Sequence, residues 1–177
     1  MDSGWECFIR ARRGDKSAWR DLVDCHRPRL MSLALLITGS AADAEDIVQE
    51  TFTRAIIAGA RHYKSTLEKY LGTIAFRLSL KEKKRSNRQA SLENFELADS
   101  AHNSLDSVIL SERDRQIAAA IRTLDKKHRD VLVLRFYGNC SYEEIAELLE
   151  ISSGTVKSRV FYAVKTCRKI LKEKGIL

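Results

Sequence analysis

Residues 141–160 read SYEEIAELLEISSGTVKSRV, and this stretch decides how the C-terminal part of the chain folds. Ser141 and Glu144 have the S-x-x-E spacing of a capping box, which predicts that a helix begins there. Ser152 or Ser153 is then placed to cap a second helix. Two helices joined by so tight a turn predict a helix-turn-helix, whose second helix enters the major groove of DNA. The alternative is an ordinary helical hairpin with a solvated basic face.

The exposed face of the second helix carries the candidate DNA contacts. Lys157 and Arg159 suit phosphates or guanine edges, and Ser158 can donate to either. Lys165 also turns outward, while Phe161 either contacts a thymine methyl or packs against the preceding helix.

The turn and the segment before it add two expectations. Glu150 follows the first helix at a position where the backbone often favours Gly. A side chain in that left-handed conformation costs about 1 kcal/mol, which does not exclude the motif. Arg135 and Tyr137 precede the motif and are placed to clamp backbone phosphate.

Charge divides the chain into three parts. The 177 residues carry a net charge of +7, which suggests an anionic partner. Residues 1–88 hold 17 basic and 11 acidic side chains, a net charge of +6. Residues 89–112 hold no basic and five acidic side chains (−5), and residues 113–177 hold 14 basic and eight acidic side chains (+6). We therefore expect one domain over 1–88, an acidic linker over 89–112 and a second domain over 113–177.

Apolar spacing predicts helices throughout, and a single Pro and eight Gly agree with this. The expected fold is all-α, with two small helical domains joined by a flexible acidic linker and a helix-turn-helix four-helix domain at the C-terminus. Pro28 predicts a kink or a new start within the helix expected over 16–37. The expected helices span 5–13, 16–37, the stretch from Ser40, 67–85, 112–124, 127–136, 142–149 and 154–172.

Two helices of the N-terminal part have distinctive charged faces. DAEDIVQETFTRA, residues 43–55, turns Ile47, Val48, Phe52 and Ala55 to a core and leaves a carboxylate-rich face, which is either solvated or a surface for a protein partner. A later helix ends in Lys81, Lys83, Lys84, Arg85 and Arg88, with Tyr63, Tyr70 and Phe76 nearby. Basic and aromatic side chains together suit a nucleic acid with unstacked bases, although a solvated basic face is the alternative.

Metal, cofactor and secretion signals are not found. Cys7, Cys25, Cys140 and Cys167 have no zinc-type spacing, so we expect free thiols, no metal site and no cofactor. MDSGWECFIRARRGD lacks the apolar segment of a signal peptide, and the longest apolar run is too short to span a membrane. The protein is expected to be cytoplasmic and not itself a membrane protein.

The order of these features resembles the extracytoplasmic-function (ECF) sigma factors of the sigma-70 family, over nearly the whole chain. The resemblance is carried by RRGDKSAWRDLV, DAEDIVQETFTRA and LDKKHRDVLVLRFYGNCSYEEIAELLEISSGTVKSRV. It implies a non-enzymatic subunit that binds bacterial core RNA polymerase, directs it to promoter DNA and is held inactive by an anti-sigma protein, often membrane-bound. The linker would then thread through the polymerase near the RNA path.

The resemblance also implies roles for individual residues. The polymerase clamp would be contacted by Asp43, Asp46, Gln49, Glu50, Phe52 and Arg54. The −10 element would be opened and read by Tyr70, Arg77, Lys81, Lys83, Lys84, Arg85 and Arg88. The −35 element would be read by Arg135, Lys157, Ser158, Arg159, Phe161, Tyr162 and Lys165.

Several residues depart from the family pattern. Tyr70 stands where Trp is frequent, Phe76-Arg77 where Arg-Asn is frequent, Lys81 where Asp is frequent and Tyr162 where Arg is frequent. Promoter preference therefore cannot be copied from a relative. A stand-alone DNA-binding regulator is the second interpretation, but it leaves the acidic helix and the acidic linker without a role. An enzyme is the third, and no Gly-rich loop or placed nucleophile supports it.

Overall fold

The computed structural model describes residues 3–59, 65–93 and 112–177. Throughout these ranges the regular structure is α-helix, as the apolar spacing predicts. Tyr63 lies outside the described residues, and so does 94–111, which includes most of the predicted linker with Glu96, Asp99 and Asp106.

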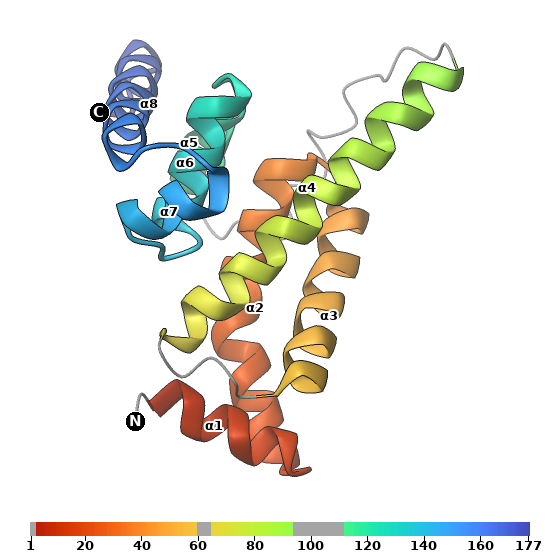
Figure 1. The fold of residues 1–177 in the computed structure, drawn as a ribbon. Coiled ribbons are helices and arrows are strands. Elements are labelled where there is room, and N and C mark those ends of the chain that lie inside the picture. The colour runs from red at the N-terminus through yellow and green to blue at the C-terminus, as the bar shows by residue number, and fades with distance from the viewer. Residues whose placement is uncertain (1–2, 60–64, 94–111) are drawn as a thin grey trace.

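The N-terminal unit contains α1 (Ser3–Arg12), α2 (Lys16–Thr38), α3 (Ala41–Ala58) and α4 (Leu67–Glu93). Asp15 caps α2, since its Oδ1 accepts the N–H groups of Ser17 and Ala18 at 3.0 Å. These helices pack against one another (Figure 1), and apolar side chains from all four form a shared core. Its fully buried members include Trp5, Phe8, Leu22, Leu33, Leu71 and Phe76.

Pro28 does not interrupt α2. The helix runs unbroken through this residue from Lys16 to Thr38. Proline removes one intrahelical bond, but Leu30, Met31 and the following turn are buried in the core and hold the helical path. Of the two expectations at Pro28, the new helix start is therefore wrong.

The C-terminal unit contains α5 (Glu112–Arg122), α6 (Lys126–Phe136), α7 (Tyr142–Leu149) and α8 (Ser153–Glu173). Asp125 caps α6, because its Oδ1 accepts the N–H of His128 at 3.0 Å. This bond, more than any other interaction, lowers the pKa of the Asp125 carboxyl. The fully buried core of this unit includes Val131, Val133, Leu134, Ile145, Val156 and Ala163.

The last helix of the N-terminal unit is longer than predicted. α4 continues to Glu93, past the expected end at residue 85 and into the segment expected to be linker. Residues 86–93 contain no Gly or Pro to stop a helix.

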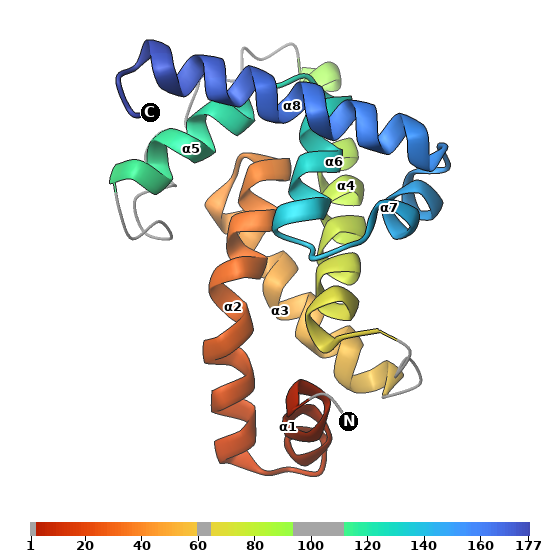
Figure 2. The same cartoon turned by 90° about the vertical axis from the view of Figure 1, so that its left-hand side faces the viewer.

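The two units lie against each other. Figures 1 and 2 show α5–α8 on one side of the N-terminal unit, with α6 beside α2 and α4. Within the described ranges, no helix is long and apolar enough to cross a membrane.

Candidate nucleic-acid and protein-docking surfaces

The helix-turn-helix has the predicted capping geometry. The N–H of Glu144 donates to Ser141 Oγ at 3.2 Å, and the N–H of Ser141 donates to Glu144 Oε2 at 2.7 Å, so the capping box is complete. Glu150 ends α7 in the left-handed conformation, at φ 55° and ψ 46°. Ser152 then caps α8 by accepting the N–H of Thr155 at 3.0 Å. The turn is thus closed by bonds at both ends.

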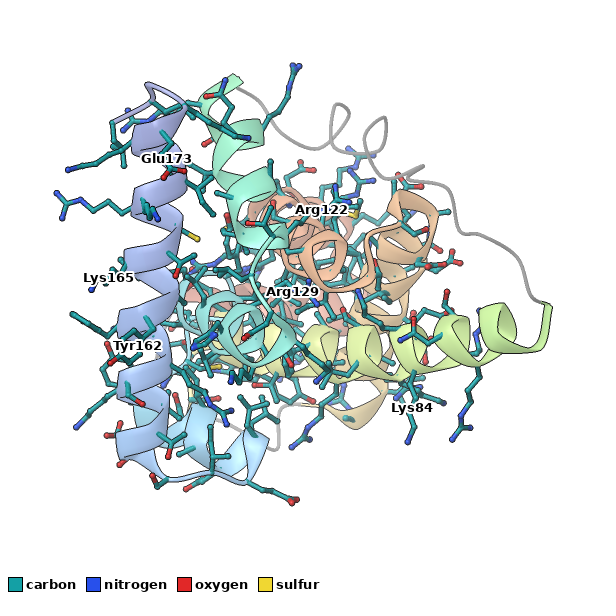
Figure 3. The ribbon with its side chains drawn as sticks, turned by 90° about the horizontal axis from the view of Figure 1, so that it is seen from above. Lys84, Arg122, Arg129, Tyr162, Lys165 and Glu173 are labelled. Atoms are coloured by element: carbon teal, nitrogen blue, oxygen red, sulfur yellow. The ribbon has the colours of Figure 1, made fainter. Side chains whose placement is uncertain are left out.

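The outer face of α8 is a row of basic and aromatic side chains. Lys157, Ser158 and Lys165 are exposed, Phe161 is 63% exposed and Tyr162 is 55% exposed. The two rings meet edge to face at 5.5 Å between centroids. Figure 3 shows Tyr162 and Lys165 pointing away from the rest of the molecule. Phe161 therefore does not pack under the preceding helix, and this face can enter a groove.

Arg159 and Arg135 are less accessible than the rest of this set. Arg159 is half-buried and lines a hollow with Asp125, Lys126 and Leu149. Arg135 donates through Nη1 to the Cys140 carbonyl at 3.0 Å, and its guanidinium lies 5.2 Å from the centre of the Tyr142 ring. Arg135 thus braces the start of the motif.

Tyr137, the second candidate phosphate clamp, has a half-buried side chain. Burial raises the pKa of its hydroxyl. Its backbone carbonyl accepts a bond from Arg29.

The acidic face of α3 forms a stripe along the helix. Asp46, Gln49, Glu50 and Arg54 are exposed and recur at spacings of three and four. Arg54 Nε donates to Glu50 Oε1 at 2.6 Å, so the one cation of the set is paired within it. Asp43 is half-buried at the start of the stripe.

Phe52 does not share this face. Its side chain is only 4% exposed and meets the Trp19 ring edge to face at 5.7 Å. The periodicity already placed Phe52 with the core residues Val48 and Ala55, and the structure agrees with the periodicity. A direct contact between Phe52 and a partner would require the core to open.

The basic end of α4 is exposed except for one lysine. Lys81, Lys84, Arg85 and Arg88 face solvent, as does Arg77 one turn earlier. Lys83 instead donates to the carbonyl of Ile37 at 2.7 Å, at the C-terminal end of α2. Burial, followed by the nearby Arg129, lowers the pKa of Lys83. Lys83 therefore links α4 to α2 through a hydrogen bond, a role that the sequence did not indicate.

The aromatic part of this surface is smaller than predicted. Phe76 is fully buried. Tyr70 is half-buried, with its ring 5.5 Å from that of Trp5 at a tilt of 37°, and burial raises the pKa of its hydroxyl. Among the aromatic residues proposed for unstacked bases, the described part of the chain leaves Tyr70 alone accessible.

The acidic and basic faces meet between α3 and α4. One hollow is lined by Asp43, Asp46 and Glu50 from α3 and by Lys81 and Arg85 from α4. A protein bound to the acidic stripe would therefore lie directly beside nucleic acid bound to the basic helix.

The cysteines and acids show no metal centre in the described ranges, where no group of three His, Cys, Asp or Glu could hold an ion. Cys7, Cys25, Cys140 and Cys167 are free thiols, and Cys140 and Cys167 are buried. Burial raises the pKa of the Cys140 thiol.

Comparison with known proteins gives consistent matches over both units. The family model "Sigma-70 region 2" matches residues 22–89, and "Sigma-70, region 4" matches residues 114–167. ECF RNA polymerase sigma factor SigL of Mycobacterium tuberculosis is 33% identical over 173 residues, covering 94% of this chain and 96% of that protein. SigW of Bacillus subtilis is 28% identical and covers 93% and 94% of the two chains.

Two solved structures share the fold. CnrH in complex with the cytosolic domain of CnrY superposes with a TM-score of 0.63 at 23% identity, covering 97% of this chain and 99% of CnrH. RpoE in complex with the anti-sigma factor NepR from Bartonella quintana gives 0.63 at 22% identity, covering 87% and 96%.

Proposed function

Because the chain belongs to the ECF group of the sigma-70 family of RNA polymerase sigma factors, we propose that it binds core RNA polymerase through α3 and directs it to specific promoters. α8 reads the −35 element, and α4 opens and reads the −10 element. The polymerase performs the chemistry, and the factor adds no catalytic step. Its place of action is the cytoplasm.

The observation that carries this proposal is the exposed face of α8. A fully capped helix-turn-helix presents Lys157, Phe161, Tyr162 and Lys165 along one side, and no other described element lies over Tyr162 and Lys165 (Figure 3). Basic side chains supply phosphate contacts, and exposed rings suit thymine methyl groups. Arg135 braces the turn before the motif, and Arg159 lies half-buried beside this face, where it lines the hollow with Asp125 and Lys126.

The acidic stripe of α3 supports a protein partner. Asp46, Glu50 and the carboxylates near them would repel DNA phosphates. A basic protein surface is the complementary partner, and we assign this role to the clamp of the largest polymerase subunit. The contact is expected to weaken with salt because exposed charges are screened.

An inhibitor protein belongs to the same proposal. The NepR of the RpoE complex is an anti-sigma factor, and this chain shares the fold of RpoE. We propose that a protein of this kind, which can itself be membrane-bound, holds the chain inactive until it is released.

The test of polymerase binding is co-elution in size exclusion. The wild-type chain is mixed with bacterial core RNA polymerase beside the double variant Asp46→Lys/Glu50→Lys, which is expected to abolish co-elution. The variant Glu147→Lys/Glu173→Lys makes the same change of charge at exposed positions of α7 and α8 and should still co-elute.

A wild-type chain that fails to co-elute would contradict the proposal. Tight binding to duplex DNA without polymerase would then favour a stand-alone regulator. Unchanged co-elution of the α3 variant would remove the docking role of the acidic stripe alone.

A further inference from the structure

Trp5 of α1 is buried at the place where α4 begins. Its side chain is 2% exposed, and its indole Nε1 donates to the carbonyl of Ser65 at 2.7 Å. Ser65 comes two residues before Leu67, the first residue of α4, and Leu67 is also buried. A buried indole N–H ordinarily has a hydrogen-bond partner. Here that bond holds the indole against the backbone that leads into α4.

The ring of Trp5 also lies against Tyr70, in the first turn of α4. The two ring centroids are 5.5 Å apart and the planes are tilted by 37°, a spacing typical of favourable aromatic pairs. Trp5 therefore contacts both the backbone before α4 and a side chain at the start of α4. The contact restricts the rotation of the Tyr70 ring.

The position of Trp5 is itself fixed within the N-terminal unit. Phe8, one turn further along α1, is fully buried and meets Trp5 edge to face at 5.5 Å between the centroids. α1 packs mainly against α2, and Figures 1 and 2 show α1 near the start of α4. Trp5 thus reaches α4 from a helix that is anchored elsewhere in the unit.

Tyr70 belongs to the face of α4 that is proposed to read the −10 element. Tyr70, Thr73 and Arg77 follow one another at spacings of three and four, so they share one side of the helix. Together with Ser65 they line one hollow along α4. Unstacked bases bind by stacking on aromatic rings. The orientation of the Tyr70 ring therefore sets where a base can stack on this face.

We propose that Trp5 is a positioning residue for the −10 contacts of Tyr70. This inference rests on the proposed function. Trp5 is too buried to touch DNA, so it acts through the Tyr70 ring, and its bond to Ser65 keeps the indole in place. α1 precedes residues 22–89, which the region 2 model matches, so the family match assigns no role to Trp5.

A positioning role differs from that of an ordinary core residue. Loss of a core side chain lowers the stability of the whole N-terminal unit, which would impair polymerase docking and promoter opening alike. Loss of the positioning residue should slow opening at the −10 element. Docking through α3 and occupancy of the −35 region through α8 should persist.

Trp5→Leu is the variant that tests this role. Permanganate oxidation of unpaired thymines measures opening at the −10 element, in polymerase assembled on a promoter selected with the wild-type factor. We expect the rate of opening to fall about tenfold, because stacking of one base on an aromatic ring contributes roughly five- to hundredfold. Leu33→Ala is the matched control: it removes buried volume from α2 and should open the promoter at the wild-type rate.

A double-mutant cycle with Tyr70→Ala tests whether Trp5 acts through Tyr70. If it does, Trp5→Leu should slow opening little further once the Tyr70 ring has been removed. Independent effects of the two substitutions, which multiply in the double variant, would overturn the positioning role.

Opening at the wild-type rate by Trp5→Leu would overturn the inference and leave the proposed function intact. An equal slowing for Leu33→Ala, or loss of co-elution with polymerase by Trp5→Leu, would mark Trp5 as a core residue and overturn the inference as well. Trp5→Phe keeps a ring and loses the Nε1–H, so it gives a second test if Trp5→Leu does not fold. It should slow opening by a smaller factor, and an unchanged rate would contradict the inference. A wild type that opens no promoter contradicts the proposed function and the inference with it.

Discussion

At the scale of single residues, Glu150 is the strained position of the DNA-reading motif. Its φ of 55° lies in the left-handed region. Among the described residues, the other non-glycine residue with this conformation is Asn139, and asparagine tolerates it better than glutamate. The N–H of Glu150 donates to the carbonyls of Ala146 and Glu147, so the conformation closes α7. The turn geometry holds although the residue is unsuited to it.

Glu150→Gly should therefore stabilise the chain. The expected gain is about 0.5–1 kcal/mol, since glycine adopts this conformation without the clash of a Cβ but loses more entropy on folding. Urea unfolding measures it as a higher midpoint at unchanged slope. Glu147→Gly, at an exposed position inside α7, should instead cost about 1 kcal/mol. A lower midpoint for Glu150→Gly would show that the Glu150 side chain stabilises the turn.

Single residues also mark the limit of what the sequence predicts. Periodicity places Phe52 in the core, and the structure confirms it at 4% exposure. No local pattern indicates that Lys83 reaches the carbonyl of Ile37, because that bond joins positions 46 residues apart. Side chains with long stems can serve either solvent or a distant backbone group, and spacing alone does not distinguish the two.

At the scale of elements, capping residues predict helix starts better than composition predicts helix ends. Ser141 and Ser152 both accept the N–H bonds expected of them. The end of α4 has no such signal, and the helix runs on to Glu93. Helix starts were predictable because a cap needs a particular side chain, whereas a polar helix without Gly or Pro can continue.

The exposed face of α8 yields a prediction about DNA binding. Lys157→Ala with Arg159→Ala should weaken occupancy of the −35 region by about 1–3 kcal/mol for each interaction with a base that the variant removes. Footprinting of the assembled polymerase on a promoter selected with the wild-type factor measures this. Lys169→Ala with Lys172→Ala removes the same charge at the other end of α8 and should leave the upstream footprint largely intact. An unaltered footprint for Lys157→Ala/Arg159→Ala would exclude that face.

At the scale of the whole molecule, the contact between the units was not predictable from the sequence. Its bonds join Arg29 to Phe136 and Tyr137, and Lys69 to Glu144, across 75 residues or more. The side chains that make these bonds, those of Arg29, Lys69 and Glu144, are of types that are ordinarily solvated. The all-α fold followed from local apolar spacing, and the division into two units followed from the distribution of charge. The relative placement of the units depends on distant pairs that no periodicity marks.

Acid should weaken this contact through Glu144. Burial alone would raise the pKa of its carboxyl, but bonds from Lys69 and the Ser141 N–H outweigh burial and lower the pKa. A lowered pKa gives stability that is full above the ordinary value of 4.5 and is lost as pH falls through the folded value. Glu144→Gln keeps a side chain suited to the capping box but removes the negative charge that Lys69 contacts. The variant should therefore have a lower free energy of unfolding than the wild type at pH 7. In urea unfolding near pH 3 the deficit should shrink, and an equal deficit at both pH values would contradict the assignment.

The shared carboxylate of Glu144 also constrains how the two halves of this factor can be recombined. One oxygen of Glu144 accepts the N–H of Ser141 at the start of the DNA-reading motif, and the other accepts a hydrogen bond from Lys69 in the opposite half. A hybrid that joined this N-terminal half to a relative's C-terminal half would need an acid at the position of Glu144. It would also need a glycine at the position of Gly138, which lies against Gly72. Exchange of promoter specificity between relatives is therefore limited by a contact of a few atoms. A substitution at this contact in one half requires a matching substitution in the other half.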